Sequence, residues 1–82
     1  MAVTYYVALP FTDSEEGPVP GEAVECQSHS GAISAAQALA KKQGNVGALA
    51  FSRTGDPELG EFQDAVLLRS FGLVAKDFEG AR

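Results

Sequence analysis

Large apolar side chains are scarce in this sequence, and that scarcity limits what the chain can fold into. Valine, leucine, isoleucine, phenylalanine, tyrosine and methionine together number 23, whereas alanine alone contributes 13 of the 82 residues. Alanine occupies little volume, so a core built from it requires neighbouring backbones to approach closely, which small side chains on a helix permit. We therefore expect one thin domain over residues 1–82.

The clearest helical pattern runs from Ser28 to Gly44. Its apolar stripe consists of Ala32, Ile33, Ala35, Ala36, Leu39 and Ala40. Ser28 or Ser30 can accept hydrogen bonds from N–H groups of the first turn, and Lys41 and Lys42 suit the negative end of the helix dipole. Gly44 is expected to follow the helix in the left-handed conformation.

Two strands are expected before this helix. Residues 3–9 alternate β-branched and aromatic residues with smaller ones, which is the pattern of a strand. Pro10 ends that strand or marks an edge position, because proline cannot donate to a ladder. Residues 13–21 read as a long loop, and residues 22–27 as a second strand with one wet face.

Two more strands are expected after the helix. Residues 46–53 form a short apolar run typical of a buried strand, and residues 64–71 favour a strand, with a helix as the alternative. Residues 54–63 are ambiguous, since Asp56-Pro57-Glu58 resembles a helix start while Gly60 opposes it. Residues 73–82 are expected to be a loosely ordered tail.

This order predicts an α+β fold of the form β-β-α-β-β. The four strands make one mostly antiparallel sheet, with the single helix on one face. Ala48 and Ala50 are expected beneath the alanine-rich helix, which places Leu49 and Phe51 on the opposite face of the sheet.

The charge and the cysteine content narrow the functional classes. The net charge is −5, and the basic residues are too scattered to follow a phosphate backbone, so we expect no nucleic-acid partner. No apolar stretch is long enough to span a membrane, which argues against a membrane partner. One cysteine excludes an internal disulfide and suits a reducing compartment, so we expect a cytoplasmic protein.

Cys26 and His29 are the weak candidates for catalytic chemistry. They form the only close thiol–imidazole pair, which a nucleophile and its base require, and a helix N-terminus follows. The competing interpretation makes Cys26 a small buried residue and His29 a polar residue at the helix start. A small enzyme or a redox-sensitive protein that uses Cys26 with His29 therefore remains an alternative. We favour a non-enzymatic protein over it.

The acidic residues do not form a recognisable metal motif. Asp56, Glu58, Glu61 and Asp64 lack the spacing of a calcium loop, and zinc would need ligands that the sequence does not contain. We expect no metal and no cofactor. An acidic inhibitor that mimics the ligand of a basic site is a further alternative.

The favoured interpretation is a non-enzymatic binding or accessory protein that acts through a sheet face or a sheet edge. A sheet with one helix leaves its second face to solvent or to a partner. The interface candidates are Tyr6, Leu49 and Phe51, and the partner would be another protein or a second copy in a homodimer.

Part of the sequence resembles a known group of proteins. The segments that carry the resemblance are residues 50–57, 60–62, 64–67 and 71–72, about a quarter of the chain. They are similar to a group of small bacterial proteins of unknown function. The resemblance implies no particular activity.

Overall fold

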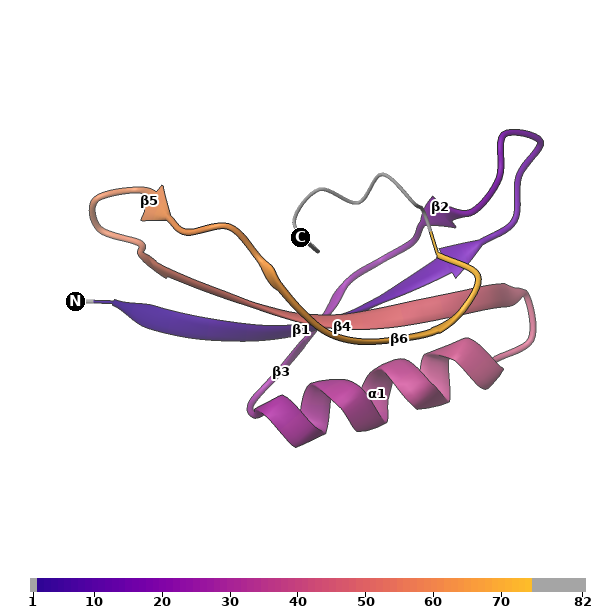
Figure 1. The fold of residues 1–82 in the computed structure, drawn as a ribbon, viewed down its shortest axis with the longest axis horizontal. Helices are drawn as coiled ribbons and strands as arrows, with labels where there is room; N and C mark the ends of the chain where they lie inside the picture. The colour runs from indigo at the N-terminus through magenta and orange to yellow at the C-terminus, as the bar shows by residue number, and fades with distance from the viewer. Residues whose placement is uncertain (1, 75–82) are drawn as a thin grey trace.

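The computed structural model describes residues 2–74, which form one helix and one antiparallel sheet (Figure 1). The elements in chain order are β1 (Val3–Thr12), β2 (Val19–Pro20), β3 (Val24–Cys26), α1 (His29–Lys41), β4 (Asn45–Asp56), β5 (Glu61–Phe62) and β6 (Val66–Gly72). The expected α+β class with a single helix is confirmed. The sheet has more strand segments than expected, because β2 and β5 add two-residue ladders at its ends.

Strands β1 and β4 form the centre of the sheet and pair with each other from Val3↔Gly55 to Thr12↔Asn45. Both β2 and β3 pair with the outer edge of β1, and both β5 and β6 pair with the outer edge of β4. Helix α1 runs along one face, while the ends of the sheet that carry β2 and β5 curl towards the other face (Figure 1).

Strand β1 continues through Pro10, where the sequence predicted its end or an edge position. The carbonyl oxygen of Pro10 accepts a hydrogen bond from the N–H of Gly21 (2.8 Å). Because the N and C=O groups of one strand residue point to the same edge, the nitrogen of Pro10 faces β2 and β3, away from β4. β3 reaches only Ala8 and β2 begins to pair at Phe11, so no ladder needs a donor at Pro10.

Helix α1 starts where the sequence predicted and ends earlier. Ser28 is the N-cap, and its Oγ accepts a hydrogen bond from the N–H of Gly31 (2.9 Å). At the other end, the side-chain amide of Asn45 donates to the carbonyl of Leu39 (2.9 Å). Gly44 has the expected positive φ of 96°, but it lies beyond the C-cap residue Lys42.

The ambiguous segment 54–63 is a tight hairpin. The Asp56-Pro57-Glu58 signal produces one turn, because Oδ1 of Asp56 accepts from the N–H groups of Glu58 (2.9 Å) and Leu59 (3.4 Å). Gly60 then adopts a positive φ of 72° and the chain returns as β5. For the next segment, residues 64–71, a strand is expected, with a helix as the alternative. Most of it lies in strand β6, so the strand prediction is confirmed.

The core has two layers, one on each face of the sheet. Ala32 and Ala36 of the helix pack on three buried sheet residues, which are Ala8, Ala48 and Ala50. On the other face lie Leu9, Phe11 and Leu49, with Val46, Phe51 and Val74 packed against them. The predicted division of strand β4 into a small-residue face and a large-residue face is therefore confirmed.

The expected loose tail over residues 73–82 lies mostly outside the described residues. In its described part, the N–H of Leu73 donates to the carbonyl of Val46 (2.9 Å). Val74 packs against the buried cluster of Leu9, Phe11 and Leu49. These two residues are therefore part of the folded structure. In the described part of the chain, no helix is long and apolar enough to cross a membrane.

Candidate functional site

The structure separates the roles of Cys26 and His29. Cys26 is half-buried at the end of β3, and its thiol donates to the carbonyl of Val24 (3.7 Å). Its side chain packs against the helix-side core. His29 is exposed as the first residue of α1. This environment is that of a small core residue beside a surface histidine.

The three interface candidates do not share one face. Tyr6 packs against the helix-side alanine cluster, whereas Leu49 and Phe51 lie on the opposite face. Leu49 is only 1% exposed and Phe51 is half-buried. The expected grouping of Tyr6 with the other two is therefore wrong, because Tyr6 pairs with Ser52 and so shares the face of Ala50.

Within the described chain, the acidic residues near the β4–β5 hairpin do not form a metal-binding cluster. The side-chain oxygen Oδ1 of Asp56 accepts a hydrogen bond from the N–H of Glu58 in the turn. Asp56 and Glu61 lie opposite each other in the ladder between β4 and β5. Among residues 2–74, no three His, Cys, Asp or Glu side chains lie close enough together to hold a metal ion.

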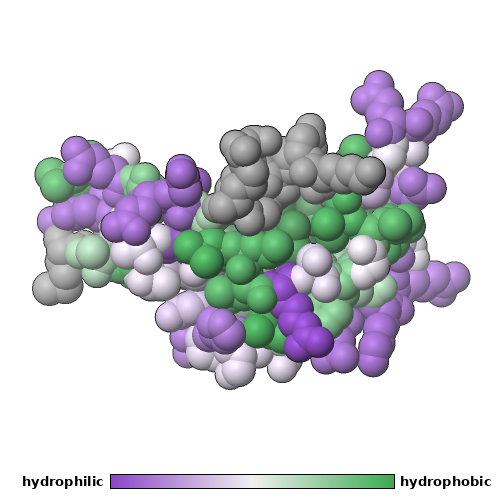
Figure 2. All heavy atoms as spheres, viewed as in Figure 1, coloured by the Kyte–Doolittle hydropathy of each residue, from purple (hydrophilic) through white to green (hydrophobic). Residues whose placement is uncertain are grey.

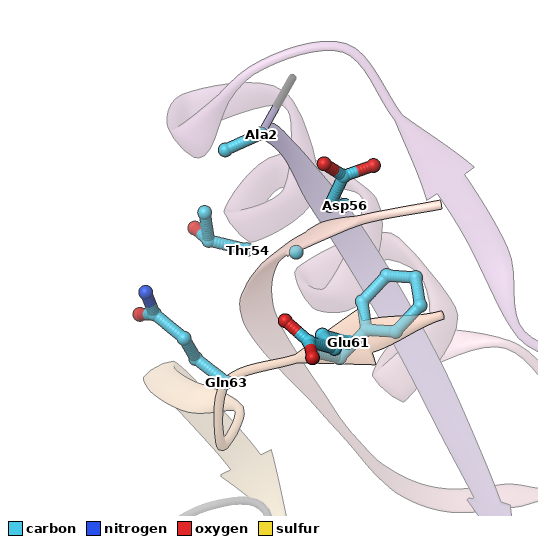
Figure 3. Close-up of a pocket in the computed structure, with 7 residues that line it drawn as sticks. Ala2, Thr54, Asp56, Glu61 and Gln63 are labelled. Carbon is cyan, nitrogen blue, oxygen red and sulfur yellow. The ribbon is translucent and has the colours of Figure 1, made fainter. Parts of the chain in front are cut away.

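An open pocket of about 280 Å³ lies beside this hairpin (Figure 3). Its lining consists of Ala2, Thr54, Gly55, Asp56, Glu61, Phe62 and Gln63. In Figure 3 the labelled side chains of Thr54, Asp56, Glu61 and Gln63 come from the hairpin and mix carboxylate, hydroxyl and amide groups, while Ala2 comes from the start of the chain. A shallow site of this kind holds no buried polar group aimed at a ligand, so it offers contact area without a catalytic constellation.

The outer edge of β6 is an exposed part of the sheet. Within residues 2–74, this seven-residue strand pairs with β4 alone. Val66 is 57% exposed and Leu67 is 39% exposed at its start, and Leu73 just beyond its end is 62% exposed. Apolar residues gather over the side of the molecule where β6 lies (Figure 2). An edge strand with exposed apolar side chains is a template for pairing with another chain.

The backbone groups at the middle of this edge point away from β4. The N–H of Leu73 donates to Val46, so Leu73 and Phe71 direct their polar groups towards β4. The groups of Ser70, which lies opposite Leu49, therefore point outwards, because the direction alternates along a strand. A β-bulge leaves Leu68 without an opposite residue and so confines the regular edge to the second half of β6.

The charged residue of β6, Arg69, lies against the aromatic ring of Phe71. The guanidinium carbon of Arg69 lies 5.4 Å from the centroid of Phe71, within the range of a cation–π contact. Phe71 in turn packs against the helix-side core. Arg69 therefore covers part of its own strand.

No direct signal in the sequence marks this edge. The pattern of residues 64–71 indicated a strand, but whether a strand is central or at an edge depends on which neighbours it finds. Comparison with known proteins brings no further guide, since no family model, no curated protein and no solved structure matches this chain.

Proposed function

We propose that this chain is a non-enzymatic binding protein that acts through the β6 edge, and that the edge pairs with the same edge of a second copy. The observation that carries the proposal is the outward-pointing backbone at Ser70, flanked by the exposed side chains of Leu67 and Leu73. The sheet edge is favoured over the sheet face because Leu49 is buried within its own chain.

The edge is self-complementary in one antiparallel register. A two-fold axis at Ser70 sets the two Ser70 residues opposite each other, where their outward N–H and C=O groups can be exchanged. The same axis brings the Leu73 end of one strand beside the Leu67 end of the other. The exposed apolar side chains of the two copies then lie next to each other.

Charge also selects this register. An axis one residue earlier, at Arg69, would set two guanidinium groups opposite each other, and like charges in directly opposed positions destabilise a strand pair. The axis at Ser70 sets Arg69 opposite Phe71 of the second copy, which repeats the cation–π contact that the chain already makes with itself. The regular edge is short, so we expect a weak dimer with a Kd in the micromolar range or above.

The test is sedimentation analysis of the intact protein across micromolar to millimolar concentrations. Ser70→Pro removes the outward N–H without touching a bond to β4, so the variant should fold and remain monomeric. Glu25→Pro is the matched control at the opposite edge. The carbonyl of Pro10 faces β2 and β3, so by alternation the groups of Ala8 and Tyr6 face β3, and those of Glu25, which lies opposite Val7, point away from β1.

Two results would overturn the proposal. One is a wild-type protein that stays monomeric over the whole concentration range. The other is a dimer that Ser70→Pro and Glu25→Pro weaken equally, since pairing would then not depend on the β6 edge.

A further inference from the structure

We infer that the β4–β5 hairpin is a second docking surface, and that its occupant is a basic segment of a protein partner. The surface is defined by the exposed apolar residues Leu59 and Phe62 and by the exposed acidic residues of the same segment, Glu58, Glu61 and Asp64. Leu59 is 68% exposed and Phe62 is 41% exposed. The hairpin lies at the end of the sheet away from the β1–β2 turn (Figure 1).

The ring of Phe62 is held in place before any partner arrives. The ring centroid of Tyr5 lies 6.1 Å from that of Phe62, and the guanidinium carbon of Arg53 lies 5.4 Å from the same ring. Gly55 lies opposite Phe62 in the ladder, where its missing side chain leaves room for the ring. A ring that is fixed in this way loses little conformational entropy on binding, which is a property of interface anchors.

The turn that presents Leu59 is also ordered. The side chain of Asp56 accepts the N–H groups of Glu58 and Leu59, and its carbonyl oxygen accepts the N–H of Gly60 (2.8 Å). The side chains of Leu59 and Phe62 are therefore presented by an ordered hairpin. They mark the position of the surface better than the carboxylates do, because acidic residues also occur elsewhere in the chain.

The charges around these anchors specify the chemistry of the partner. Glu58, Glu61 and Asp64 are exposed, and none of them is in an ion pair with a described residue. Arg53 lies at this end of the sheet. Its Nε donates a hydrogen bond to the carbonyl oxygen of Gln63 (3.0 Å), and its guanidinium group makes a cation–π contact with the ring of Phe62. Because the whole chain carries a net charge of −5, the complementary surface is basic.

A lysine or arginine side chain satisfies both parts of the surface at once. Its charged head can reach the carboxylates while its aliphatic stem lies against Leu59 and the ring of Phe62. We therefore expect an extended segment in which basic and apolar residues alternate. This inference is independent of the β6 edge, since it uses other residues at another surface.

The experiment uses a synthetic peptide of alternating arginine and leucine, titrated into the full chain and followed by fluorescence anisotropy and backbone chemical shifts. A peptide of alternating glutamate and leucine is the reference probe. We expect saturable binding of the basic peptide alone, with shift changes centred on residues 56–63. Leu59→Ser should weaken binding several-fold without altering the fold, because Leu59 is a turn residue with its side chain in solvent.

A charge-matched pair of variants separates a site from general attraction. Glu58→Gln with Glu61→Gln removes two charges at the hairpin, and Glu15→Gln with Glu16→Gln removes two at the opposite end of the molecule. We expect the first pair to weaken binding about fivefold and the second to leave it nearly unchanged, because exposed charges act over short distances in salt. Equal losses in both pairs, or binding that Leu59→Ser does not alter, would refute the inference. Ser70→Pro should bind the peptide as the wild type does.

Discussion

Phe62 lies over Gly55 on the neighbouring strand, in the position that a side chain at residue 55 would need. A Cβ atom at Gly55 would collide with the Phe62 ring and with the carbonyl oxygen of Glu61. The contact joins the end of the long central strand β4 to the short return strand β5. It adds to the hydrogen bond from the N–H of Gln63 to the carbonyl of Thr54 (2.8 Å) in holding the two-residue ladder at the end of the sheet.

Gly55→Ala should therefore destabilise the protein by about 1–3 kcal/mol, because the added methyl group forces Phe62 and the β5 backbone away from β4. Urea unfolding measures the change. Gly21→Ala is the control, since a Cβ there meets the ring of Pro10 at an ordinary 3.4 Å and should alter the free energy of unfolding little. Similar losses in the two variants would mean that the Phe62 contact is not the cause.

Ser28→Ala should lower the free energy of unfolding by about 1 kcal/mol, because the N–H of Gly31 loses its acceptor at the start of the helix. Ser30→Ala tests the second serine that the sequence offered as a cap. Ser30 lies inside α1 and is exposed, so its replacement should be neutral or slightly stabilising. If Ser30→Ala were the more damaging variant, the assignment of the cap would be reversed.

Ala36→Leu should cost about 1–3 kcal/mol or more, because Ala36 is fully buried between α1 and the alanines of the sheet. Ala38→Leu places the same side chain on the exposed side of the same helix and should be nearly neutral. The comparison of the two by thermal unfolding isolates packing from helix propensity. A loss confined to Ala38→Leu is the result that would contradict the layer arrangement.

Cys26 should react with a thiol reagent several-fold more slowly in the folded protein than in the urea-unfolded chain. The thiol is half-buried against the helix-side core and donates to the carbonyl of Val24. Time-resolved labelling followed by mass measurement gives both rates. Folded protein that reacts as fast as unfolded chain, or faster, would restore the hypothesis that Cys26 is a reactive nucleophile.

Sequence reasoning succeeded where one local pattern determines the outcome. A serine cap, which the sequence left open between Ser28 and Ser30, and the apolar stripe define the helix. The alternation of small and large residues on β4 assigns Ala48 and Leu49 to opposite faces. These features depend on periodicity and on side-chain volume, both of which are visible along the chain.

It failed where the outcome depends on distant segments. Pro10 is acceptable inside β1 only because β2 and β3 leave a gap beside it, and that gap is a property of the sheet. The turn at Asp56 uses the same residues as a helix start, and β5 returns because Gly55 leaves room for Phe62. The candidate site at Ser70 was missed for the same reason, since an edge is defined by the absence of a neighbour.

The central pairing of β1 with β4 also determines when the sheet can form. Val3 and Gly55 are paired, and between them lie the helix and the strands β2 and β3 that depend on β1. In a growing chain that ends at α1, Ala32 and Ala36 still lack Ala48 and Ala50 of β4 to pack against. Pairing β1 with β4 closes that long loop, so we expect the docking of β4 to be a slow step in folding.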